Sequence, residues 1–334
     1  MSIGLNYKKL IKFCLIIACF IALIVADSFI PIKYLSSYFG LAVQDVATCN
    51  DGACVHFIDV GYGDCTFMRL PDGKTVLIDG GDGSFKNNLA ITSLITAHGV
   101  NKIDYLFCTS VLAKRCGGLA EIVNEYKVDN AFYPYCIKPS VNSSYKKFMS
   151  ALKNSGAKLK YLQAGVGFES EEYGYLLRVL SPIDHENPMS EYTDLNSQYS
   201  TKNANGASGI IYFSYGGVNL LLCGDADKFR LENLCESYLL GAFSNVNFFG
   251  EIQLENCKII KVANGGKGQN FSSSVFNFIK PETAIVSYGY DYYNYPSASL
   301  LSYAPNLKGV YLTNGANVNL TIAGGGYTVS RKEK

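Results

Sequence analysis

Short apolar runs separated by turn residues fill the first half of the chain beyond residue 54. Such runs, bounded by glycine, proline and aspartate, indicate strands, and "PDGK" between two of them is typical of a hairpin turn. Apolar residues at helical spacing predict helices between later strands. The predicted strands are residues 55–60, 65–70, 75–78, 105–108 and 130–133, and the predicted helices are residues 88–97 and 119–126.

The second half repeats this order of elements. Further strands are expected in "LKYLQAG", "YGYLLRVLSP", "SGIIYFSYGGVNLLLCGDA", "CKIIKVAN" and "TAIVSYG", with helices at residues 145–153, 228–236 and 273–279. Strand runs with interspersed helices, repeated twice, favour two packed sheets with helices outside. The predicted class is therefore α/β, a four-layer αββα sandwich behind an N-terminal hydrophobic helix.

The N-terminus forms a separate unit. Lys8, Lys9 and Lys12 precede an uncharged run at residues 13–26, and the apolar character continues to residue 32 after Asp27. A run of this length fits a cleaved secretory signal or a short membrane anchor, and both alternatives stay open. Both place the rest of the chain outside the cytoplasm, because lysines stay inside. The expected localisation is the cell membrane, single-pass with an extracytoplasmic domain, or secretion after cleavage.

The predicted domains are an anchor or signal at residues 1–33, a connector at 34–53 and the sandwich at 54–330. Residues 1–33 hold four of the 29 basic and one of the 28 acidic side chains, which leaves a net charge of −2 on the remainder. Nucleic-acid surfaces are usually basic, so the total charge does not support nucleic acid as a partner.

Eleven cysteines are present, and none of them forms a C-x-x-C pair, so a zinc ribbon is not expected. Cysteines in apolar runs, such as Cys108 in "YLFC" and Cys223 in "LLLC", should be buried thiols. We expect one or two disulfides at most, and Cys49 and Cys54 are the closest pair in sequence. The three histidines, His56, His98 and His185, are expected to be structural or solvent-facing.

Several segments together carry a family resemblance. They are "VHFIDVGYGDCTFMRLPDGKTVLIDGG", "KIDYLFCTSVLAKRCGGL", "SGIIYFSYGGVNLLLCGDAD", "IIKVANGGKGQNFSSSVFNFIKPETAIVSYG" and "YNYPSASLL". In order and spacing, over residues 55–314, they resemble the consecutive blocks of the metallo-β-lactamase fold. The chain is most similar to the soluble domain of ComEC-type DNA-uptake proteins and its free-standing relatives.

The resemblance implies a metal site whose ligands have been lost. Hydrolases of the family bind zinc, but only the bridging aspartate is kept here, as Asp225 in "CGDAD". Since lysine and arginine repel a divalent metal and cannot coordinate it, no metal cofactor is expected. The positions that match the family's histidine and aspartate ligands are Ser110, Leu112, Lys114, Arg115, Asn264 with Gly265, and Tyr295.

Three other aspartates, Asp59, Asp64 and Asp79, look like the family's turn-shaping residues. Lys114 or Arg115 should reach Asp225 in an ion pair. The alternative is that both cations point into solvent and Asp225 caps a turn.

These features favour a non-catalytic, membrane-tethered binding or scaffold module, a pseudoenzyme whose partner is an unknown protein or small ligand. The first alternative is a metal-dependent hydrolase, similar to phosphodiesterases or nucleases, with a site rearranged around Asp225. The second, by analogy with the family, is an accessory role in DNA uptake. The tyrosine-rich residues 288–297 could form an aromatic binding wall or be buried against the second sheet.

Overall fold

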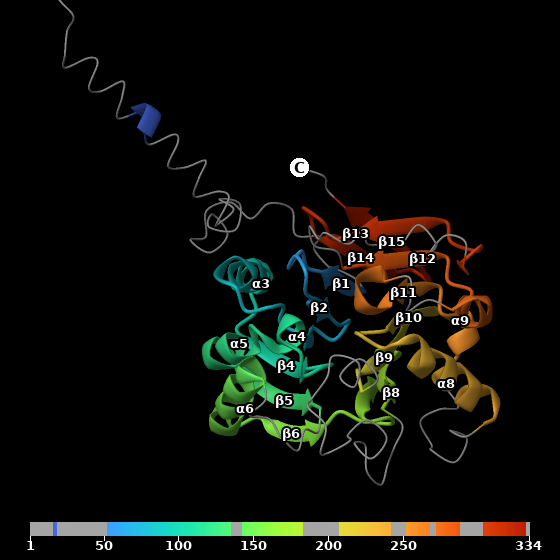
Figure 1. The fold of residues 1–334 in the computed structure, drawn as a ribbon, viewed down its shortest axis with the longest axis horizontal. Helices are drawn as coiled ribbons and strands as arrows, with labels where there is room; N and C mark the ends of the chain where they lie inside the picture. The colour runs from blue at the N-terminus through green and yellow to red at the C-terminus, as the bar shows by residue number, and fades with distance from the viewer. Residues whose placement is uncertain are drawn as a thin grey trace, which may run out of the picture.

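A computed structural model describes residues 16–18, 52–134, 142–182, 207–241, 252–267, 272–287 and 303–331. Over these residues the chain forms two large mixed sheets with helices on their outer faces (Figure 1). The predicted α/β class with two sheets is therefore confirmed.

The first sheet has eight strands in the order β15-β14-β1-β2-β3-β4-β5-β6. The "PDG" segment closes the β2–β3 hairpin, where Leu70 N–H donates to Lys74 O over 2.9 Å and Gly73 has a φ of 80°. From β3 to β6 the strands run parallel. The strands are β1 Ala53–Phe57, β2 Thr66–Arg69, β3 Thr75–Ile78, β4 Lys102–Phe107, β5 Lys127–Tyr133, β6 Lys158–Tyr161, β14 Val318–Ala323 and β15 Gly326–Arg331.

The second sheet has seven strands in the order β13-β12-β11-β10-β9-β8-β7. Its β10–β13 half is parallel and its β7–β10 half is antiparallel. The strands are β7 Gly167–Ser170, β8 Tyr175–Ser181, β9 Ile210–Tyr215, β10 Val218–Leu222, β11 Ile259–Lys261, β12 Thr283–Val286 and β13 Gly309–Leu312.

Three apolar clusters hold the layers together. One lies between the sheets and includes Phe57, Phe107 and Phe213. Another packs the first sheet against its helices, and a third packs the second sheet against α8 and α9. The helices are α3 Phe85–Ala97, α4 Ala113–Cys116, α5 Leu119–Glu125, α6 Ser143–Ser155, α8 Lys228–Leu239 and α9 Ser273–Ile279, with 3-10 turns η2 Leu254–Asn256 and η3 Ala263–Gly266.

The expectation that the second half of the chain repeats the order of the first is wrong in one respect. The strand predicted in "LKYLQAG" is β6, which pairs with β5 in the first sheet. The C-terminal hairpin β14–β15, which was not predicted, also joins the first sheet, because β14 pairs antiparallel with β1. The sheet that β6 and the β14–β15 hairpin join depends on pairing between strands, and the local periodicity of the sequence does not report that pairing.

Several predictions fall outside the described residues. They include most of the hydrophobic segment and its connector, the tyrosine-rich residues 288–297, His185 and Tyr295. Residues 16–18 are helical. Across the described ranges no helix is long and apolar enough to cross a membrane. The domain bounds therefore stay predictions.

The cysteines in the described ranges agree with the expectation of buried thiols. Cys108 and Cys223 are free and fully buried, and burial raises the pKa of both thiols. Cys54 is disulfide-bonded. The free, buried cysteines of the described part are Cys65, Cys108, Cys116, Cys223, Cys235 and Cys257.

Candidate functional site

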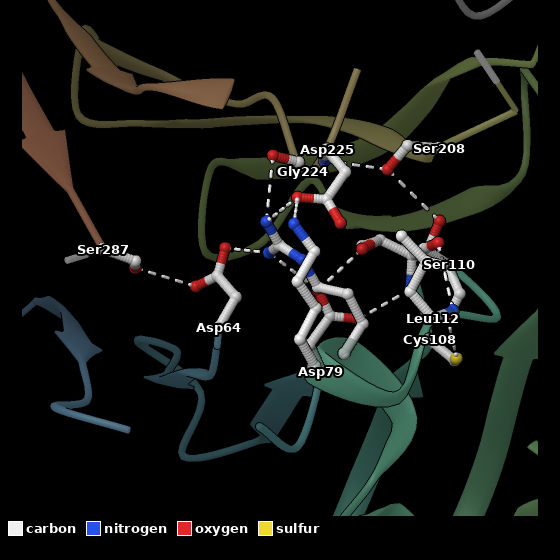
Figure 2. A network of polar contacts seen from close by, with 12 residues as sticks. Asp64, Asp79, Cys108, Ser110, Leu112, Ser208, Gly224, Asp225 and Ser287 are labelled. Carbon is white, nitrogen blue, oxygen red and sulfur yellow. Dashed lines mark hydrogen bonds and ion pairs between the residues drawn. The ribbon is translucent and has the colours of Figure 1, made fainter. Parts of the chain in front are cut away.

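Loops from both sheets meet at one edge of the sandwich, where the parallel strands end. Asp79 follows β3, Arg115 lies on α4 after β4, Asp225 follows β10 and Asn264 lies on η3 after β11. The carboxyl ends of parallel strands lie on the same edge of a sheet, so segments far apart in sequence come together there. Figure 2 shows Asp64, Asp79 and Asp225 converging from separate segments.

The guanidinium of Arg115 is the centre of this cluster. Its Nη1 contacts a carboxylate oxygen of Asp64 and lies 3.3 Å from Asp79 Oδ2. Its Nη2 lies 2.6 Å from Asp225 Oδ1 and donates to Gly224 O over 3.1 Å. The Arg115 side chain is 3 % exposed. One planar cation therefore joins three carboxylates from two sheets, which its fork of donors allows.

Two lysines complete the charge of the cluster. Lys114 Nζ lies 3.0 Å from Asp225 Oδ1 and 2.7 Å from Asn264 Oδ1. Lys261 Nζ contacts Asp64 Oδ2. Three aspartates thus lie at short range from three cations. The predicted ion pair with Asp225 is confirmed for both Lys114 and Arg115, and the alternative in which both point into solvent is wrong.

Hydrogen bonds to neutral groups fix the carboxylates further. Asp79, at a φ of 62°, accepts from Thr109 N–H over 2.7 Å and from the Thr109 hydroxyl over 2.6 Å. The Ser287 hydroxyl donates to Asp64 Oδ1 over 3.0 Å. The Asp225 N–H donates to Ser208 Oγ over 2.9 Å. The loops are therefore held by backbone contacts as well as by charge.

The remaining predicted positions have structural contacts. Ser110 is buried and its Oγ accepts from Leu112 N–H over 3.3 Å, so both shape the turn before α4 (Figure 2). Asp59 accepts from Gly61 N–H over 3.3 Å, as a turn-shaping aspartate would. Asp64 differs from that expectation, because the partners of its side chain are Arg115, Lys261 and Ser287.

Sequence reasoning missed Lys261, Thr109, Ser208 and Ser287. The sequence contained one indication for Lys261, because it is a lysine at the end of an otherwise apolar strand. In the structure this residue is 2 % exposed. A buried lysine needs a partner, which predicts a carboxylate nearby. The hydroxyl groups carry no comparable pattern, since serine and threonine are common in turns.

Burial and charge move the carboxyl pKa values in different directions. Burial, together with repulsion from Asp64, raises the pKa of Asp79 to about 7, although Arg115 opposes the shift. Burial also acts on Asp64 and Asp225, but there the paired cations outweigh it and the pKa of each is lowered. Asp79 is the exception because, among the described residues, its one ion pair is with Arg115, at 3.3 Å.

The residues of the cluster do not fit a bound metal. Every carboxylate oxygen of Asp64 and Asp79 already has a donor, as does Asp225 Oδ1. Among the carboxylate oxygens of these three aspartates, Asp225 Oδ2 alone is buried without a hydrogen-bond partner in the described part of the chain. Three adjacent cations would repel a divalent ion. Over the same residues, no group of three or more His, Cys, Asp and Glu side chains could hold a metal.

The histidines lie elsewhere. His56 on β1 hydrogen-bonds Asn319 Oδ1 through Nδ1 over 2.8 Å, and its ring lies 4.6 Å from that of His98. Burial lowers the pKa of both, to about 3 for His98. Both are therefore neutral groups within the first sheet and α3, as expected for structural histidines.

No protein-family model matches the sequence, and no curated protein sequence matches it. Metallo-β-lactamases are among the similar solved structures. A CmlA β-hydroxylase variant is 12 % identical to this chain, with a TM-score of 0.49. The similarity covers 86 % of this chain and 58 % of the hydroxylase chain. This chain thus spans less than two thirds of that hydroxylase.

Two metallo-β-lactamases are similar over a smaller part of this chain. A HARLDQ-motif enzyme from Cronobacter sakazakii is 14 % identical to this chain, with a TM-score of 0.36. The similarity covers 63 % of this chain and 77 % of the enzyme chain. The Rm3 metallo-β-lactamase is also 14 % identical, with a TM-score of 0.36, and the similarity covers 62 % of this chain and 77 % of the lactamase chain.

We expect the central ion pairs to be strongly coupled. Arg115→Ala and Asp225→Ala should each lower the free energy of unfolding by about 3–5 kcal/mol, because either change removes one of the partners that the remaining buried charges contact. The double variant should cost clearly less than the sum. Lys114→Ala with Asp225→Ala should behave in the same way. Urea unfolding of the single and double variants measures both couplings.

The exposed pair Lys228–Glu232 is the matched control, because its Lys228→Ala change should cost only about 0.3–0.5 kcal/mol. Strict additivity for Lys114 and for Arg115 alike would contradict the coupling.

The protonation of Asp79 should make stability fall as pH rises. An unfolded aspartate loses its proton near pH 4, whereas folded Asp79 keeps it up to about pH 7. Between these values the folded protein binds the extra proton, so its stability decreases by about 1 kcal/mol per pH unit. Asp79→Asn, which tolerates the positive φ, should remove this component. The measurement is the free energy of unfolding of the natural chain and of Asp79→Asn from about pH 5 to 8. If the two curves run parallel over this range, the role of Asp79 is refuted.

Proposed function

We propose that this protein is a pseudoenzyme of the metallo-β-lactamase fold, in the ComEC-like branch, which acts as a binding or scaffold module. The observation that carries the proposal is the buried guanidinium of Arg115 between Asp64, Asp79 and Asp225. It lies among the carboxylates that would otherwise be free to bind a metal. The ordered sequence blocks over residues 55–314 support the family.

The electrostatics of the cluster oppose metal-dependent hydrolysis. Arginine does not lose its proton in proteins, and the surrounding carboxylates raise the pKa of Arg115 further against the effect of burial. The cation therefore cannot be removed by a change of pH alone. A substrate or metal would have to displace a side chain with four short contacts. The role left to the domain is to present surfaces to a partner.

The first alternative is a hydrolase, phosphodiesterase-like or nuclease-like, around Asp225. The unpartnered Oδ2 of Asp225 is the one observation in its favour, since this atom could accept a further donor. A metal-dependent reaction there would require Arg115 and Lys114 to leave Asp225 Oδ1. An accessory role in DNA uptake rests on family analogy, and the net charge of −2 beyond residue 33 gives it no support.

We expect the purified protein to carry far less than one equivalent of zinc or manganese after growth with either metal. Chelator should leave its melting temperature unchanged, and bis-p-nitrophenyl phosphate should not be hydrolysed. Elemental analysis and the absorbance assay measure these outcomes. Near-stoichiometric metal with chelator-sensitive turnover would overturn the proposal in favour of the hydrolase.

A matched variant tests whether the loop backbone itself permits metal binding. It combines Ser110→His, Leu112→His, Lys114→Asp and Arg115→His, which restores imidazole and carboxylate ligands and removes two cations. This variant should gain metal and a chelator-sensitive melting temperature, since ligand binding stabilises the folded state.

We further propose that the domain lies on the outer face of a bacterial membrane, held by the hydrophobic segment within residues 1–33. The three lysines before that segment support this direction. Protease added to intact cells should degrade the domain while a cytoplasmic marker survives. Full protection until lysis would reverse the orientation, and release into the medium would favour the cleaved signal.

A further inference from the structure

Residues 143–161, the α6–β6 corner, include α6 and β6 and carry positive charges and no negative ones. Residues 143–161 contain five lysines and no acidic residue. All five side chains are exposed. The chain beyond residue 33 has a net charge of −2, so this is a local concentration and does not follow from the composition. The five are Lys146, Lys147 and Lys153 on α6 and Lys158 and Lys160 on β6.

These lysines differ in their contacts from Lys102 and Lys308, which form ion pairs at the surface. Lys102 pairs with Asp104 at 2.6 Å, and Lys308 pairs with Glu282 at 2.8 Å. Within the described ranges, no ion pair includes any of the five lysines of the corner. Five unpaired like charges repel one another, and an acidic partner would relieve that repulsion.

Within the described residues, no further strand pairs with the outer edge of β6. It is the last strand of the first sheet, and all four of its residues are exposed. Beyond it, Leu162 N–H donates to Tyr133 O on β5 over 2.8 Å. Since N–H groups alternate in direction along a strand, the N–H and C=O of Leu159 point away from β5. An open strand edge can pair with a further strand.

The side chains of β6 alternate in chemistry. Lys158 and Lys160 project to one side, whereas Leu159 and Tyr161, which are 37 % and 46 % exposed, project to the other. Tyr161 also packs edge-to-face against Tyr133 with ring centroids 5.2 Å apart. The strand thus presents a charged row and an apolar row on either side of its free backbone groups.

Lysines on an edge strand commonly prevent aggregation, and that role alone would explain Lys158 and Lys160. It does not explain the three lysines of α6, which lie on a helix and guard no strand edge. A polyanion without a peptide backbone would use the charges but leave the edge of β6 unpaired. An extended acidic peptide uses both features.

We propose that the α6–β6 corner is a docking surface for an extended peptide segment in which acidic and apolar residues alternate, added to the first sheet beside β6. The acidic side chains would face Lys158 and Lys160, and the apolar ones would lie beside Leu159 and Tyr161. The α6 lysines would attract the acidic segment at longer range.

This inference rests on the proposed function, since it names the class of partner that a binding module would take. Its test leaves the Arg115 cluster intact. Bound metal and turnover would defeat the pseudoenzyme proposal without changing binding at β6, so the two failures are distinguishable.

The test measures fluorescence anisotropy of a labelled eight-residue peptide that alternates glutamate with valine, added to the full chain. We expect saturable binding that weakens as salt rises, and no binding of the same peptide with lysine in place of glutamate. Lys158→Gln with Lys160→Gln should weaken binding by about fivefold or more. The control, Lys86→Gln with Lys258→Gln, removes equal charge elsewhere and should change little.

Leu159→Pro separates strand addition from simple charge attraction. Proline removes an N–H that points away from β5, and such positions on edge strands tolerate it. The variant should keep its melting temperature and lose peptide binding. Equal binding by this variant, or no binding by the natural chain, would overturn the proposal.

Two further arms test other occupants. Binding of single-stranded DNA or phosphatidylglycerol vesicles that depends on the five lysines and is unaffected by Leu159→Pro would overturn the proposal in favour of a polyanion surface. Residues 183–206 of this chain contain four acidic side chains. If changing these four residues to amides strengthens peptide binding, the acidic segment that occupies the β6 edge belongs to this chain. That result would overturn the proposal of a separate partner.

Discussion

The buried guanidinium of Arg115 is the interaction on which the edge of the sandwich depends. Without it, the three carboxylates of Asp64, Asp79 and Asp225 would be left with too few counter-charges in a site from which water is excluded. Burying charge is costly, and the cost is offset here by short contacts to several partners at once. Asp79 follows a strand of the first sheet and Asp225 one of the second, so a single side chain fastens the two sheets.

A metal ion and an arginine can hold carboxylates together in similar ways, but they differ in what they permit. A metal with an open coordination position can bind and activate water, whereas a guanidinium has donors only and keeps its proton. Lys114 and Lys261 add two further fixed charges on the same carboxylates. The cluster therefore holds the three aspartates together through hydrogen-bond donors and fixed positive charges.

Local sequence signals predicted much of the first sheet and part of the cluster. The "PDG" turn specifies the β2–β3 hairpin through the geometry of proline and glycine, and the cationic turn after β4 indicated a partner for Asp225. Lys261 and Ser287 were missed because their partner, Asp64, lies about 200 residues away in sequence. The pairing of β14 with β1 was missed for the same reason, since contacts between distant segments leave no periodic trace.

That pairing of β14 with β1 has a consequence for how the chain is made. β1 begins at Ala53 and its partner ends at Ala323, and His56 and Asp59 form hydrogen bonds with Asn319 and Asn317. One side of β1 stays unpaired until β14 has been synthesised. A nascent chain therefore cannot complete its first sheet on the ribosome in order of emergence, and contacts of such long range fold slowly. Completion of the first sheet is thus delayed until β14 has been synthesised, and the apolar faces of its earlier strands need protection from aggregation during that interval.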